Sequence, residues 1–180
     1  MNVVLKKINK SSDDFKRAKR LYLRAFPANE RAPFWILSSK AKKSYVDFLG
    51  IYCKDKWVGL MYVVRYKSAC YIFYFAVSDK LRYKGFGSAA LKQVKKKYSD
   101  YTLFLAIEPI EANAANLDER KNRREFYIKN GFNPTNLRIR EGKMIYEVLS
   151  NGKVDPDNYT ALMRRYISPF PSRMFSIFHI

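Results

Sequence analysis

The chain has 180 residues, of which 48% are hydrophobic and 16% aromatic. This length is enough for a compact domain with a hydrophobic core, and the composition argues against a disordered chain. Its 35 lysines and arginines against 16 acidic residues give a net charge of +19. Such a balance favours an anionic partner (nucleic acid, an acidic membrane or a polyphosphorylated ligand), or reflects a solvated lysine-rich surface.

The first third of the sequence predicts a strand followed by helices. Residues 3–8, VVLKKI, are rich in β-branched and other apolar side chains and are expected to form a short strand. Residues 13–26 carry apolar side chains at helical spacing, with Ser11 or Ser12 as the N-cap and Pro27 ending the helix. Residues 30–44 then predict a shorter helical segment.

A run of three antiparallel strands is expected next. Residues 45–53 and 57–66 form a hairpin around a short polar turn, and residues 70–77 form a third strand. That third strand, CYIFYFAV, is apolar and aromatic throughout, which is typical of burial on both faces.

The second half predicts helix, strand, helix and hairpin. A helix should run to Tyr98 and a buried strand over residues 101–107, while the polar residues 111–122 are expected to form a loop. A helix over residues 123–130 ends at Gly131, in the position of a C-cap glycine. The last hairpin spans residues 136–149.

The C-terminal part is expected to form a helix and an aromatic tail. Asp155 and Pro156 occupy the N-cap and first positions of the helix. Phe170, Phe175 and Phe178 of the tail extend the sheet, cover it or contact a second copy of the chain. The order of elements predicts an α+β fold with a mixed, mostly antiparallel sheet. We expect one domain over residues 1–150, with residues 151–180 packing on it or in a dimer contact.

The stretch LRYKGFGSAAL, residues 81–91, allows three interpretations. Gly85, Gly87 and Ala90 fit a dinucleotide fingerprint, with Glu108 about 20 residues on. That interpretation fails on geometry, because residues 78–84 separate the first glycine from the strand and the strand belongs to an antiparallel meander. In the second interpretation the stretch is a turn whose glycines only supply positive φ. In the third it is a cradle in which backbone N–H groups and a helix N-terminus bind a diphosphate.

The pattern R-x-x-G-x-G entering a helix resembles the acyl-CoA loop of the GNAT superfamily of N-acetyltransferases. REFYIKNGF, residues 124–132, is similar to the later helix and turn of that family, and the order of elements over residues 1–149 matches. AFPANERAPFWIL resembles the N-terminal helices of some bacterial members. The resemblance implies a GNAT-like sheet and transfer of an acetyl group from acetyl-CoA to a primary amine in a ternary complex.

The resemblance also implies cofactor contacts. The third strand would pair with the pantetheine arm, an N–H near Val77 would hold the developing oxyanion, and the loop would bind the pyrophosphate. The implied contacts are Phe75, Ala76, Val77, Arg82, Tyr83, Lys84, Gly85, Phe86, Gly87 and Ser88.

Two residues are candidates for the chemistry. Tyr127 stands at the family's general-acid position, and with Phe126 packed inward it would point towards the cofactor. Many members of the family carry a glutamate that acts as the general base at the position of Phe73. Glu108 is therefore the candidate to replace it, either as the general base or in positioning the substrate. Glu108 is equally interpretable as an exposed carboxylate or the partner of a lysine. Arg120 or Arg123 would reach a CoA phosphate, or both are solvated surface charges.

The acceptor is expected to be a peptide, a protein N-terminus or a small amine, since no acidic cluster suits a polycation. The alternatives are a basic module that binds nucleic acid or the ribosome without catalysis, and an acyl-CoA-binding protein without turnover. Cys53, Cys70 and the single His179 predict no structural metal site. No apolar run approaches the roughly 20 residues of a membrane span, and no secretory signal is evident, so a cytoplasmic protein is expected.

Overall fold

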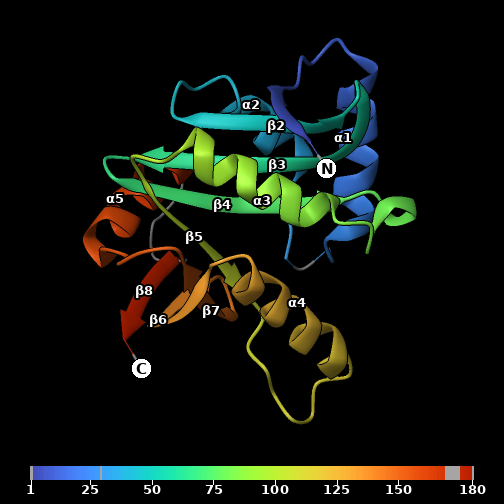
Figure 1. Ribbon diagram of the computed structural model, residues 1–180. Helices are drawn as coiled ribbons and strands as arrows, with labels where there is room; N and C mark the ends of the chain where they lie inside the picture. Colours follow the sequence, from blue (N-terminus) through green and yellow to red (C-terminus); the bar gives the residue numbers. More distant parts are fainter. Residues whose placement is uncertain (1, 29, 169–174, 180) are drawn as a thin grey trace. The chain divides into compact units, whose positions relative to one another are not determined.

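The computed structural model describes residues 2–28, 30–168 and 175–179, and these fall into two compact units (Figure 1). Unit 1 comprises Met1–Val64 and Ile72–Ser99, and unit 2 comprises Arg65–Tyr71 and Asp100–Ile180. The strand β4 contributes its first residues to unit 2 and the rest to unit 1.

Unit 1 holds the elements of the N-terminal half. They are β1 (Val4–Lys7), α1 (Asp13–Ala25), α2 (Phe34–Lys40), β2 (Val46–Cys53), most of β3 (Lys56–Tyr66), the end of β4 (Ala69–Val77), the short helix η1 (Asp79–Leu81) and α3 (Phe86–Lys97). Unit 2 holds β5 (Thr102–Ile107), α4 (Leu117–Lys129), β6 (Asn133–Glu141), β7 (Met144–Ser150), α5 (Pro156–Ile167) and β8 (Phe175–His179).

The strands form an open sheet in the hydrogen-bonded order β1-β2-β3-β4-β5-β7-β6-β8. The pairs β1–β2, β2–β3, β5–β7, β6–β7 and β6–β8 are antiparallel, whereas β4 and β5 are parallel. The predicted α+β class with a mixed, mostly antiparallel sheet is confirmed.

In unit 1 the helices cover both faces of the strands. Phe48 and Asp47 are neighbours on β2 and therefore point to opposite faces. Phe48 packs against Phe15 of α1 and Phe34 of α2, with ring centroids 6.3 and 6.0 Å away. The buried Asp47 accepts a 2.8 Å hydrogen bond from the hydroxyl of Tyr98, at the end of α3. Figure 1 accordingly shows α3 on one side of these strands and α1 and α2 on the other.

In unit 2 aromatic packing joins the first residues of β4 to β5 and α5. The rings of Tyr71 and Phe104 stack with centroids 5.0 Å apart, and Tyr159 of α5 meets both rings edge-on. Asp155 caps α5 as predicted, accepting hydrogen bonds from the backbone N–H groups of Asp157 and Asn158.

Two local expectations need correction, and the tail follows one of the alternatives expected for it. Helix α4 begins at Leu117, within the stretch expected to be a loop, because Asp118 and Glu119 in its first turn stabilise a helix N-terminus despite the lack of apolar residues. Strand β4 is buried on both faces only up to Ile72; beyond it Phe73, Phe75 and Val77 are half-exposed. In the tail, Phe175 and Phe178 lie in β8, which pairs with β6, and Phe170 lies outside the described residues.

Candidate functional site

The end of β4 in unit 1 is held in place by a glycine on β3. A Cβ added at Gly59 would overlap the carbonyl oxygen of Ala76 and lie 3.1 Å from the Cα of Val77. The backbone N–H of Ser78 also donates to the carbonyl of Val58 at 2.9 Å. The two backbones therefore approach more closely than any side chain at position 59 would permit, which fixes the residues predicted to meet the pantetheine arm.

A charged turn connects β4 to the glycine loop. In η1, Asp79 forms ion pairs with Arg24 of α1 at 2.7 Å and with Arg82 at 2.9 Å. Tyr83 follows with φ of 61° and a fully exposed side chain. A tyrosine rarely adopts this left-handed conformation, and backbone strain of this kind is concentrated at functional sites.

Gly85 begins helix α3 in a conformation that leaves the helix N-terminus open. Its φ is 82°, it is the N-cap residue, and no side chain caps the helix. A Cβ at Gly85 would meet no atom within 4 Å, so the space beside the backbone is empty of protein. The first helical hydrogen bond reaches Gly85 from the N–H of Ala89, at 3.1 Å. The N–H groups of Phe86, Gly87 and Ser88 thus precede the helical ladder and suit an anion.

In unit 2, Glu108 lies directly after β5 and is the centre of an ion-pair cluster. Its carboxylate is within 2.8 Å of Arg120 Nη2 through one oxygen and within 2.8 Å of Arg123 Nη1 through the other. Glu108 is 8% exposed, so it is not an exposed carboxylate, and its ion-pair partners are arginines, not a lysine. The amide of Asn116 donates a longer hydrogen bond of 3.4 Å to the same group.

The sequence left open that Arg120 is a solvated surface charge, and the structure shows that it is not. Its side chain is 13% exposed, and besides Glu108 it contacts the carboxylate of Glu111 at 3.4 Å. It also donates to the carbonyl of Pro109 and the side chain of Asn116, both at 2.8 Å. The helix places Arg120 and Arg123 one turn apart, so both guanidinium groups reach one carboxylate.

Tyr127 lies one turn after Arg123 on the same helix. Burial raises the pKa of Tyr127 to about 12, with an opposing contribution from the charge of Arg123. Its ring meets those of Phe126 and Phe132 edge-on, at 5.2 and 6.3 Å. Tyr127 is buried while Phe126 is half-exposed, so the expectation that Phe126 packs inward in its place is wrong. The phenol is accordingly held protonated in an apolar setting.

The predicted site residues thus form two groups. Phe75, Ala76 and Val77 lead within unit 1 into the loop from Arg82 to Ser88, while Glu108, Arg123 and Tyr127 lie together in unit 2. Sequence reasoning missed Gly59. Its only signal was a glycine inside a strand, which often marks a close approach of another backbone.

The described residues contain neither a membrane-spanning helix nor a cluster suited to a metal ion. No helix there has both the length and the apolar character needed to cross a membrane. Nor do three or more histidine, cysteine, aspartate or glutamate side chains gather there in a way that would bind a metal ion.

Comparisons with known proteins bear on the fold. No family model and no curated protein matches the sequence. A Bacteroides thetaiotaomicron protein assigned to the GNAT acetyltransferases matches with a TM-score of 0.73 and 20% identity, over 90% of this chain and 94% of that one. The ribosomal-protein-S18-alanine N-acetyltransferase of Escherichia coli matches with a TM-score of 0.59 and 17% identity, over 82% and 92%.

A third solved structure agrees with these two. It is a GNAT family acetyltransferase from Elizabethkingia anophelis with acetyl-CoA bound, and it matches with a TM-score of 0.58 and 16% identity, over 83% of this chain and 97% of that one. The fold is therefore that of the GNAT acetyltransferases. This agrees with the resemblance of the loop and of the later helix.

Proposed function

We propose that the protein is an acetyl-CoA-dependent N-acetyltransferase that acts on a primary amine of a peptide, a protein or a small molecule. The observation that carries the proposal is the open N-terminus of α3, with left-handed Gly85 as its cap and no side chain occupying the N–H groups that follow. Such an arrangement on a GNAT fold suits the diphosphate of acetyl-CoA. A neighbour with acetyl-CoA bound supports the same ligand.

In the proposed reaction the neutral amine attacks the thioester carbonyl. A C–N bond forms, the C–S bond breaks, and the CoA thiolate leaves. The N–H near Val77 stabilises the oxyanion, and the N–H groups from Tyr83 to Ser88, with Arg82 and Lys84, hold the diphosphate. Tyr127 supplies the proton that the thiolate takes up.

For Glu108 the pairing with two arginines supports a positioning role rather than that of the base. A carboxylate whose two oxygens each meet a guanidinium at 2.8 Å is poorly placed to accept a proton from an amine. We propose that Glu108 fixes the direction of Arg123, and that water takes the proton of the amine.

The cofactor site is tested by replacing Gly87 with glutamate. The new carboxylate would lie where the diphosphate is proposed to bind, so acetyl-CoA affinity should fall by about a hundredfold. That loss corresponds to roughly two charge-assisted hydrogen bonds. Isothermal titration calorimetry at moderate salt measures it.

Gly152→Glu makes the same change of residue and charge at an exposed turn of unit 2, and should bind acetyl-CoA like the wild type. Equal affinities of the wild type and Gly87→Glu would exclude the loop as the diphosphate site. Absence of acetyl-CoA binding by the wild-type protein would exclude the whole proposal.

Replacing Tyr127 with phenylalanine should lower kcat by about 10²- to 10⁴-fold and leave acetyl-CoA affinity unchanged, because only the proton donor is lost. Since burial raises the Tyr127 pKa to about 12, the phenol stays protonated across pH 6–10. The wild-type rate should therefore rise with pH as the amine loses its proton and show no alkaline decline from this group. Initial rates against pH measure both effects.

Tyr159→Phe is a matched control for this variant. The Tyr159 hydroxyl is buried and makes no hydrogen bond within the described part of the chain, so its removal should leave kcat unchanged. A Tyr127→Phe enzyme with full kcat would remove Tyr127 from the mechanism without affecting the cofactor proposal.

A further inference from the structure

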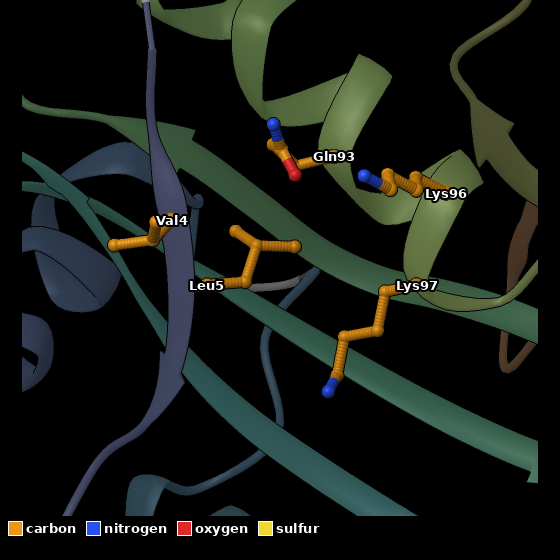
Figure 2. A pocket seen from close by; sticks show the side chains of 5 residues that line it. All are labelled: Val4, Leu5, Gln93, Lys96 and Lys97. Carbon is orange, nitrogen blue, oxygen red and sulfur yellow. The ribbon is translucent and has the colours of Figure 1, made fainter.

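A groove runs between strand β1 and helix α3 in unit 1, at the end of α3 opposite to the glycine loop. Its volume is about 340 Å³, and it is lined by Val4, Leu5, Gln93, Lys96 and Lys97. Figure 2 shows Leu5 pointing from the strand towards the helix, with Gln93 and Lys96 extending from the helix above it. Val4 is 44% exposed, and Figure 2 shows its side chain on the opposite side of the strand from Leu5, so Leu5 is the apolar side chain that faces the two lysines.

The backbone of β1 has one free edge. This strand is the first in the sheet order, and no other described strand pairs with its outer side. The N–H of Ile8 donates to the carbonyl of Phe48 on β2 at 2.9 Å. Because backbone groups alternate in direction along a strand, those of Lys6 face β2 as well, and those of Leu5 and Lys7 face outward.

The positive charge in the groove comes from α3 and is not neutralised by the chain. Lys6 and Lys7 of β1 form ion pairs with Asp55 at 3.3 Å and with Asp47 at 2.9 Å. Lys96 and Lys97 form no ion pair with the described residues; Lys97 only lies over the ring of Tyr98, 5.7 Å from its centroid. The groove therefore attracts an anionic ligand.

The two walls of the groove are tied to one buried carboxylate. Asp47 binds Lys7 of β1 through one oxygen and the hydroxyl of Tyr98, which follows α3, through the other, at 2.9 and 2.8 Å. Asp47 is 3% exposed, so the tie is shielded from solvent. The spacing between the strand and the end of the helix is thus fixed within the unit.

We propose that this groove binds an extended acidic peptide segment of a partner protein, which adds a strand to the free edge of β1. Main-chain hydrogen bonds to Leu5 and Lys7 would set the register. Apolar side chains would cover Val4 on one face of β1, and acidic side chains would meet Lys96 and Lys97 on the opposite face, beside Leu5 (Figure 2). A second copy of the chain is a poor occupant, because it would bring lysine-bearing strands together. Nucleic acid is also disfavoured, since no aromatic side chain lines the groove for base stacking.

The probe is a fluorescein-labelled peptide of alternating glutamate and valine, measured by fluorescence anisotropy with the full chain. The double variant Lys96→Glu/Lys97→Glu should weaken its binding by about tenfold or more, since two attractive contacts become repulsive. The matched control is Lys42→Glu/Lys43→Glu, which makes the same charge change at exposed residues between α2 and β2 and should bind within about twofold of the wild type.

Two further probes separate strand addition from general electrostatics. The same peptide methylated at every backbone nitrogen has no N–H group on either edge to donate to a strand, and should bind at least about tenfold more weakly. A single-stranded RNA of equal charge should bind without preference for Lys96 and Lys97. The proposal is overturned by equal losses in the two double variants, by an unaffected methylated peptide, by no binding at all, or by RNA that binds more tightly and depends on these two lysines.

Discussion

Replacing Glu108 with glutamine is expected to lower the free energy of unfolding by about 2–3 kcal/mol, because the change leaves Arg120 nearly buried without its main counter-charge. The loss should fall short of the full value for a buried ion pair for two reasons. Glutamine keeps one hydrogen-bond acceptor, and the side chain of Arg123 is 39% exposed and can turn to solvent. Urea unfolding followed by circular dichroism measures the change.

Glu125→Gln is the matched control on helix α4. Its ion pair with Lys129 spans 3.5 Å between side chains that are 65% and 76% exposed, so its loss should cost less than about 0.5 kcal/mol. One experiment separates the proposed positioning role of Glu108 from the role of general base. A stable Glu108→Gln protein with a large loss of kcat would contradict the positioning role and identify Glu108 as the general base.

Replacing Gly59 with alanine should destabilise the protein by about 1–3 kcal/mol and weaken acetyl-CoA binding, because the new methyl group would collide with backbone atoms of β4. Alanine also stiffens the unfolded chain, which stabilises by about 0.4–1 kcal/mol and does not compensate for the collision. Relief of the clash requires Ala76 and Val77 to move, and these are proposed cofactor contacts. Chemical unfolding and calorimetric titration of acetyl-CoA measure the two effects.

Gly152→Ala supplies the comparison for this variant. A Cβ there would lie 3.6 Å from the side chain of Thr102, an ordinary contact, so stability should stay within about 0.5 kcal/mol of the wild type. If Gly59→Ala were as stable as Gly152→Ala and bound acetyl-CoA normally, β4 would not depend on the close approach at Gly59.

The elements that the sequence predicted well are those with strong local signals. Ser12 caps α1 and accepts a hydrogen bond from the N–H of Phe15, as the helical pattern after it indicated. The hairpin of β2 and β3 follows from two apolar runs around a polar turn. The glycines of residues 81–91 indicated a turn with positive φ before a helix, and Gly85 has a left-handed φ as the N-cap of α3; its place in an anion-binding site stays a prediction.

Long-range pairing of charges was beyond sequence reasoning. Glu108 and its two arginine partners are 12 and 15 residues apart, and nothing local indicates which of the many cations reaches this carboxylate. The start of α4 was missed for a related reason, since only Tyr127 of its residues is buried and an apolar stripe is lacking. The ion-pair partners of Glu108 and the start of α4 are both determined by packing within unit 2, which local sequence propensity does not specify.

The division of β4 has a consequence for synthesis of the chain. Unit 2 takes Arg65–Tyr71 from the middle of the sequence of unit 1, and the first residues of β4 pair with Thr102–Phe104 of β5. During translation, the start of β4 therefore lacks its partner on the β5 side until β5 leaves the ribosome, although β3 on its other side is already available. Neither unit corresponds to one continuous stretch of the gene, so a truncation at the end of α3 would expose an apolar strand segment to aggregation instead of yielding an autonomous fragment.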